Sequence, residues 1–186
     1  MCFSGLGQIV FGGIMVLCLA LTAASMFSDG WRKYPDDQHS GIFGYNCVNP
    51  NITNGQTQKQ ICNEWWKNLK TWEKVTVIAM SLALVAELVC LAYNVFACFA
   101  CCWKKYVIHP LSALAALVAI FLAIAVVVYG VNNKNAFDEV KDNFTNGQKI
   151  TTQLGYSYFL AIAALILAVI DIFVAALTIC LAESCI

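Results

Sequence analysis

The cysteine side chains are the first residues of this sequence that could carry out chemistry. Cys98 and Cys101 are separated by two residues, the spacing of a thiol pair that can cycle between dithiol and disulfide. This spacing alone suggests a thiol oxidoreductase. The sequence supplies neither a second redox pair nor an electron acceptor nearby, so we rank this activity last and predict that the protein is not an enzyme.

Two acidic residues, Glu87 and Asp171, stand inside long apolar stretches. An acid within a membrane-spanning helix costs about 2.5–3.5 kcal/mol on insertion scales and normally faces a bundle interior or a polar cavity. A functional interpretation is an ion or proton path, or a contact with a partner channel. The structural interpretation is favoured, because the spans contain no basic partner: each acid is protonated or hydrogen-bonded to a neighbour such as Ser81 or Tyr93.

Metal, cofactor and nucleic-acid sites are not predicted. His39 and His109 fall on opposite sides of the membrane in the topology argued below, which disfavours zinc. The sequence has no P-loop or dinucleotide-binding glycine pattern. Its formal net charge is zero, so no bulk electrostatic argument supports nucleic acid as a partner.

The composition requires a lipid environment for the elements that carry these residues. Hydrophobic residues make up 60% of the 186 residues and charged residues 12%, and the mean hydropathy is +0.70. Soluble domains have roughly 45–50% apolar and about 25% charged residues. Each of four apolar blocks reaches the roughly 20 residues that cross a bilayer as a helix. We predict spans at about 9–27, 75–100, 111–131 and 156–182.

The first block has an alternative interpretation as a cleaved signal peptide, because small residues at 23–25 precede polar sequence. The segment before it carries no positive charge, and the apolar stretch exceeds a normal signal-peptide core. We therefore expect this block to be retained as the first span of a single four-span domain.

Two signals place the loops at residues 28–74 and 132–155 outside the cell, and the loop at 101–110 and both termini in the cytoplasm. Glycosylation sequons begin at Asn51 and Asn143, one in each of the two outer loops. Cys47 and Cys62 are the only cysteines in those loops, an even number in a compartment that permits disulfides. We expect them to form a disulfide, which for a loop of about 15 residues contributes roughly 3 kcal/mol in the chain-entropy model.

The first outer loop has the pattern of a small folded unit. Residues 31–34 and 41–48 resemble short strands, and 140–145 of the second outer loop could add another. Residues 63–74 contain no helix breaker and place Trp65, Leu69 and Trp72 on one helical face, which predicts an amphipathic helix leading into the second span.

Small residues four apart in the third and fourth spans predict close helix packing. They are Ala115, Ala119, Ala123, Ala164 and Ala168.

This pattern resembles the superfamily of claudins, peripheral myelin proteins and epithelial membrane proteins. The family signature in the first loop is a tryptophan after span one, then Gly-Leu-Trp, two residues, a cysteine and a partner cysteine. Trp31-Arg32 is similar to the first element, and Gly41-Ile42-Phe43 followed by Cys47 is similar to the second. The resemblance implies a left-handed four-helix bundle with a small antiparallel extracellular β-sheet formed by both outer loops.

The sequence departs from this signature in three ways. Phe43 replaces a tryptophan, three residues rather than two precede Cys47, and the spacing to Cys62 is longer than in typical vertebrate claudins. An invertebrate claudin-like protein would fit these departures. Tetraspanins, the main competing class, carry a large second loop with a Cys-Cys-Gly motif, and this chain has neither feature.

Several cytoplasmic residues are candidates for modification or binding. Cysteines beside Lys104-Lys105 favour reversible palmitoylation over inert thiols or redox chemistry; the lipidation candidates are Cys2, Cys98, Cys101 and Cys102. The last residues, Ser184, Cys185 and Ile186, match a C-terminal PDZ-binding pattern. The alternative is a terminus without a binding role.

Three functions follow in order of preference. The first is a claudin-like adhesion protein of the plasma membrane at cell–cell junctions, which assembles with itself in cis and trans and shapes paracellular permeability. The second is a modulatory subunit of a larger channel or receptor. The third is the thiol oxidoreductase.

Overall fold

A computed structural model describes residues 3–33, 39–42, 58–99, 104–133 and 153–184 of the chain. Four long helices dominate this part of the protein: α1 (Phe3–Phe27), α4 (Thr71–Phe99), α5 (Lys104–Asn132) and α7 (Tyr156–Ser184). Each contains a segment long and apolar enough to cross a membrane, by length and composition. Their apolar side chains, with backbone hydrogen bonds closed inside each helix, suit a lipid environment.

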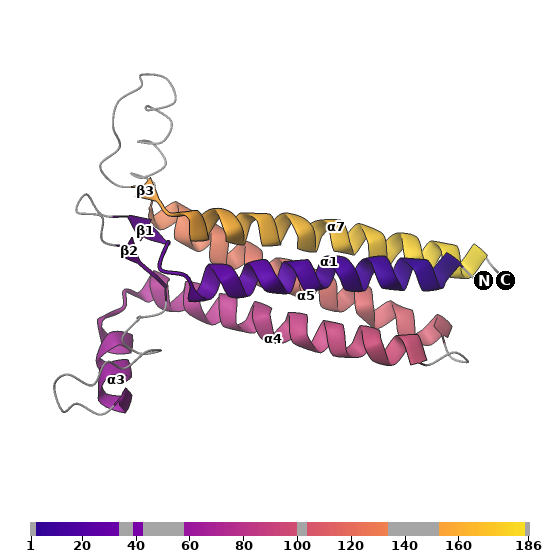
Figure 1. Cartoon of the computed structure of the whole chain (residues 1–186), viewed down its shortest axis with the longest axis horizontal. Coiled ribbons are helices and arrows are strands. Elements are labelled where there is room, and N and C mark those ends of the chain that lie inside the picture. Colours follow the sequence, from indigo (N-terminus) through magenta and orange to yellow (C-terminus); the bar gives the residue numbers. More distant parts are fainter. Residues whose placement is uncertain (1–2, 34–38, 43–57, 100–103, 134–152, 185–186) are drawn as a thin grey trace, which may run out of the picture.

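The four helices lie side by side as a bundle, with both termini at one end (Figure 1). Contacts are made between α1 and α7, α7 and α5, α5 and α4, and α4 and α1. The helices therefore form a closed ring around one core. The chain belongs to the class of membrane helical bundles that the sequence predicts.

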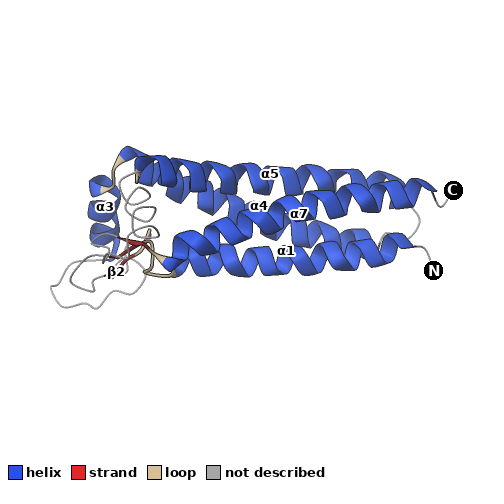
Figure 2. Cartoon of the chain, turned by 90° about the horizontal axis from the view of Figure 1, so that it is seen from above, coloured by secondary structure: helices blue, strands red, loops and turns tan. Residues whose placement is uncertain are grey.

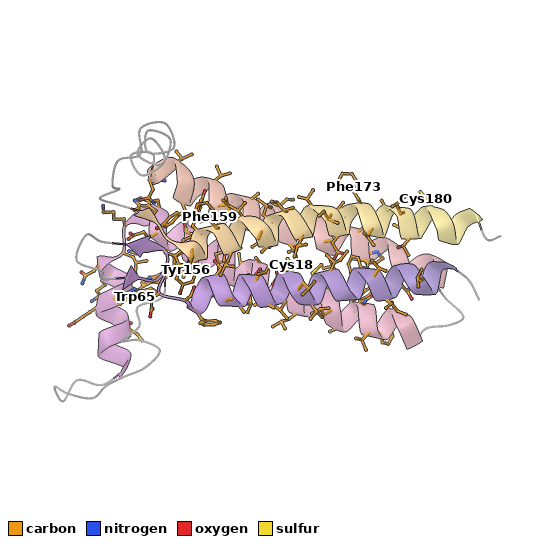
Figure 3. The ribbon with its side chains drawn as sticks, turned by 45° about the horizontal axis from the view of Figure 1, so that its top comes forward. Cys18, Trp65, Tyr156, Phe159, Phe173 and Cys180 are labelled. Atoms are coloured by element: carbon orange, nitrogen blue, oxygen red, sulfur yellow. The ribbon has the colours of Figure 1, made fainter. Side chains whose placement is uncertain are left out.

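Small side chains allow the helices to approach one another, as the alanine pattern predicts. Ala115, Ala164 and Ala168 are fully buried, Ala119 is nearly so, and Ala123 is half-buried. Large apolar side chains also cover the outer surface, and Phe173, which is 65% exposed, points away from the bundle (Figure 3). An apolar outer surface is expected where lipid, rather than water, contacts it.

A separate helix, α3 (Gln58–Asn68), crosses the end of the bundle opposite the termini (Figures 1 and 2). The amphipathic helix predicted over residues 63–74 is confirmed in part: 63–68 belong to α3 and 71–74 to α4, but the chain bends at Leu69 and Lys70 between them. The carboxylate of Glu73 accepts a hydrogen bond from the backbone N–H of Lys70 at 2.9 Å. This contact satisfies a backbone donor at the start of α4, as the acidic residue of a capping box does.

Three two-residue strands connect the loops at the same end of the bundle. They are β1 (Arg32–Lys33), β2 (His39–Ser40) and β3 (Gln153–Leu154), in the order β2-β1-β3 with antiparallel pairing. Arg32 lies opposite Ser40 on one side and Leu154 on the other. Of the predicted strand at 41–48, only Gly41 and Ile42 are described, and neither is in a strand; 140–145 lies outside the described residues.

Candidate functional site

Trp31, the first residue of the predicted loop signature, lies at the junction of α1 and β1. Its side chain is 1% exposed, and its indole N–H donates a hydrogen bond of 2.6 Å to the carbonyl oxygen of Ser25 in the last turns of α1. A tryptophan can be buried without cost to its N–H when a carbonyl accepts that hydrogen. The side chain thus fixes the direction in which the first loop leaves the bundle.

Three further aromatic residues form a cluster with Trp31, and we call the four the aromatic anchor: Trp31, Trp72, Tyr129 and Tyr158. The Tyr129 ring lies edge-on to Trp31 with centroids 4.7 Å apart, and its hydroxyl donates to the Trp31 carbonyl at 3.0 Å. Tyr158 and Trp72 also pack against Tyr129, at 5.4 and 5.6 Å. Because α4, α5 and α7 contribute the other three rings, the anchor connects the first loop to the ends of these helices.

The second loop is attached to the same point through its backbone. The N–H of Gly155 donates to the carbonyl of Trp31 at 3.2 Å, and the N–H of Ser157 donates to the carbonyl of Gly30 at 3.1 Å. The Ser25 hydroxyl donates to the Ser157 carbonyl at 2.8 Å. A side chain at Gly155 would overlap the backbone of Gly30, so glycine permits this approach. Together with the β1–β3 pairing, these bonds hold the start of the first loop and the end of the second as one unit.

A cavity of about 290 Å³ opens beside the anchor, between α3, α4 and the sheet. Its lining includes Trp31 and Tyr129 of the anchor and Trp65 of α3. Glu73 and Thr76, in the first turns of α4, are polar residues of the lining.

Glu87 lies inside the bundle, fully buried, and contacts α1. Its Oε1 atom accepts hydrogen bonds from the hydroxyl of Thr22 at 2.8 Å and from the thiol of Cys18 at 3.2 Å. The expectation of a bond to Ser81 or Tyr93 is wrong. Ser81 donates to the carbonyl of Val77 within its own helix. Both residues are six positions from Glu87, about 1.7 turns, so they lie on a different face of α4.

Asp171 of α7 is also fully buried, but neither of its carboxyl oxygens has a hydrogen-bond partner among the described residues. The second carboxyl oxygen of Glu87, Oε2, also has no hydrogen-bond partner among the described residues. Cys90 lies within electrostatic range of both acids. Because Glu87 and Asp171 face the bundle interior, neither side chain is placed to contact a partner protein in the membrane.

Some of the remaining predicted site residues lie in the part of the chain that the structure describes, and the others lie outside it. Arg32 is in β1, Gly41 and Ile42 follow β2 and line the cavity, and Cys62 of α3 is disulfide-bonded. Cys98 and Ser184 lie near the ends of α4 and α7, with side chains outside the described part. Wholly outside it are Phe43, Cys47, Asn51, Asn143, Cys2, Cys101, Cys102, Cys185 and Ile186.

The sequence analysis did not identify Tyr129 and Tyr158 as the residues that contact Trp31. It also did not identify Thr22 as the residue that donates a hydrogen bond to Glu87. Tyr129 and Tyr158 have a signal of their own, because aromatic residues near the ends of apolar spans gather at membrane interfaces. Thr22 has none, because one hydroxyl in an apolar helix normally bonds to its own backbone.

A comparison with protein-family models gives a match over the whole chain. Residues 1–186 match the family described as "Tight junction protein, Claudin-like". A comparison with curated proteins found no match. The chain belongs to the claudin-like family of tight junction proteins.

Proposed function

We propose that this protein is a structural component of cell–cell contacts that assembles with copies of itself through its first loop and shapes paracellular permeability. One observation carries the proposal: β1 of the first loop pairs with β2 of that loop and with β3 of the second, while Trp31 fixes the same strand to the bundle. A loop that must bind neighbouring proteins needs such a rigid base, because ordering it on binding would reduce affinity.

The proposal places the two loops outside the cell and both termini in the cytoplasm. The loop ends gather at one end of the bundle and the termini at the other (Figure 1). The sequons at Asn51 and Asn143 support this orientation. So does a disulfide at Cys62, whose proposed partner is Cys47, since disulfides persist in oxidising compartments.

Charges of the first loop are the proposed determinants of ion passage. By the resemblance to claudins these are Asp36, Asp37, Lys59 and Glu64. Glu64 is exposed on α3, at the surface that would face a neighbouring molecule. Cytoplasmic palmitoylation and a PDZ scaffold at the C-terminus remain further proposals.

A modulatory subunit of a channel is the second candidate, and the structure provides no specific support for it. That function was suggested by Glu87 and Asp171 contacting a partner within the membrane. Both are fully buried inside the bundle. Self-assembly through the loops is therefore the better-supported function.

The test is expression in paired epithelial cell layers, with an intracellular tag, while transepithelial resistance is recorded. We expect the protein to accumulate at cell–cell contacts, to form strands in freeze-fracture images and to change the resistance. Cys47→Ser and Cys62→Ser should abolish these effects. The matched control is Cys180→Ser, since Cys180 is an exposed cysteine near the end of α7, away from the loops.

Surface biotinylation would establish that each variant reaches the plasma membrane, so that loss of function is separated from loss of trafficking. Diffuse surface staining of the wild type with unchanged resistance would contradict the proposal. Co-purification of a channel under those conditions would favour the modulatory function.

A further inference from the structure

We propose that Lys70 and Lys74, beside Trp66, bind the phosphate of an anionic phospholipid at the start of α4, with the acyl chains of the lipid along the apolar outer face of the same helix. The inference does not rest on the proposed function at cell contacts. It rests on the charges of the two lysines, on the position of Lys74 and on the apolar surface that begins beside it.

The two lysines bring positive charge to one place. The backbone N–H of Lys74 donates to the carbonyl of Lys70 at 3.1 Å, so the residues are one helical turn apart, and side chains at this spacing are neighbours on a helix surface. Lys70 is exposed and Lys74 is half-buried. Neither ammonium group has an ion pair among the described residues. Both charges are therefore available to an anion from outside the chain.

The position of Lys74 is set by an aromatic contact between two helices. Its ammonium lies 6.0 Å from the ring centroid of Trp66 in α3, within the range of a cation–π interaction. Trp66 is itself 38% exposed. Helix α3 crosses the end of the bundle directly before α4 begins (Figure 1). Tryptophan and lysine side chains at the end of a membrane span settle at the level of the lipid headgroups.

An apolar surface continues from this point along the outer face of α4. Ile78 is four residues after Lys74 and belongs to a row of large apolar side chains that are 39–55% exposed: Val75, Ile78, Leu82, Val85 and Val89. Their intervals of three and four residues place them on one face of the helix. A molecule held by Lys74 can therefore extend its apolar part along this row.

An anionic phospholipid matches both parts of this surface. A soluble phosphate or an acidic peptide would meet the two charges but not the apolar row. A zwitterionic lipid carries a cation that the lysines repel. Each lysine close to a membrane surface increases the affinity for anionic lipid by about fivefold, so the two lysines together distinguish the anionic lipid from a zwitterionic one.

The experiment uses the full-length protein in a maltoside detergent, and native mass spectrometry counts the lipids that stay bound. Three probes are titrated at constant ionic strength: dioctanoyl phosphatidylglycerol, dioctanoyl phosphatidylcholine and glycerol phosphate, which has no acyl chains. We expect the first phosphatidylglycerol to bind more than about tenfold more tightly than phosphatidylcholine. Glycerol phosphate should not bind in the same concentration range.

Two variants test the site against a matched control. Lys70→Gln and Lys74→Gln should each weaken the binding of phosphatidylglycerol by about fivefold. The control is Lys67→Gln, which removes the same charge from an exposed lysine directly after Trp66. Successive side chains of a helix point about 100° apart, so Lys67 lies off the face by which Trp66 contacts Lys74, and this variant should bind the lipid as the wild type does.

Equal affinity of the wild type and both test variants would overturn the proposal. An equal loss in Lys67→Gln and Lys74→Gln would also overturn it, because attraction to the overall charge would then explain the binding. Glycerol phosphate that binds as tightly as phosphatidylglycerol would assign the lysines to a soluble anion instead. Melting temperatures without added lipid establish that each variant is folded, and Lys70→Gln tests the site independently of the contact between Lys74 and Trp66.

Discussion

The hydroxyl of Tyr129 donates a 3.0 Å hydrogen bond to the backbone carbonyl of Trp31, and the two rings lie edge-on with centroids 4.7 Å apart. The end of the third membrane helix is thereby bonded to the start of the first loop. The N–H of Gly155 donates to the same carbonyl. One backbone oxygen therefore connects both loops and the bundle.

Replacing Tyr129 by phenylalanine should loosen this connection while leaving the ring in place. We expect Tyr129→Phe to lower the free energy of unfolding by about 0.5–1.5 kcal/mol, toward the lower value because Gly155 still satisfies the carbonyl. Thermal melting in detergent measures the effect. Tyr156→Phe is the matched control, since Tyr156 is 58% exposed. Equal losses in the two variants would show that the hydrogen bond to Trp31 contributes nothing specific.

Adding a methyl group at Gly155 should disrupt the attachment of the second loop. A Cβ there would overlap the carbonyl of Gly30, and backbone atoms cannot move aside as a flexible side chain can. We expect Gly155→Ala to cost more than about 2 kcal/mol, measured by thermal melting and by the monodispersity of the purified protein. Gly13→Ala is the control, because a Cβ at Gly13 meets nothing within 4 Å. Similar stability of the two variants would contradict the close approach.

The bundle could be predicted from the sequence because its determinants are local. A long apolar stretch identifies each span, and the alanines that pack inside the bundle recur at intervals of four residues. The bend at Leu69 and Lys70 could not be predicted in the same way, because neither residue is a helix breaker. The capping contact from Glu73 to Lys70 and the packing of α3 across the bundle end decide it.

The contacts of Glu87 and Trp31 could not be predicted from the sequence, because they join residues that are far apart in the chain. Periodicity indicates that Glu87 faces inward but not which helix it meets. Its partner Thr22 is 65 positions away on α1. Likewise, Trp31 was recognised as a signature residue, but its contacts with Tyr129 and Gly155 depend on the order in which the four helices surround the core.

Removing the hydroxyl of Thr22 should destabilise the bundle interior. In Thr22→Val the side chain keeps its shape, but Oε1 of Glu87 retains only the weak thiol donor of Cys18. We expect a loss of about 1–3 kcal/mol, the cost of an under-satisfied buried polar group, measured by thermal melting. Thr178→Val is the control, since the hydroxyl of Thr178 donates to Val174 within its own helix. Equal melting temperatures of Thr22→Val and Thr178→Val would contradict a specific role for the hydrogen bond from Thr22 to Glu87.

Neutralising the two acids of the core should have different consequences, because their surroundings differ. Glu87 accepts two hydrogen bonds, whereas Asp171 has no hydrogen-bond partner among the described residues. Asp171→Asn keeps the size of the side chain and removes a group that costs about 2.5–3.5 kcal/mol to insert, so we expect a higher melting temperature. Glu87→Ala removes the acceptor of the Thr22 hydroxyl, while the Cys18 thiol keeps the Ala164 carbonyl at 3.3 Å, and this variant should have a lower melting temperature.

Thermal melting of both variants at several salt concentrations distinguishes this account from one in which Asp171 binds an ion. If Asp171→Asn lowers the melting temperature, and the wild type gains stability with one particular cation, the carboxylate has a ligand that the protein itself does not supply. If the melting temperature rises and is independent of the cation, Asp171 is a buried acid that the bundle tolerates because its remaining contacts are strong.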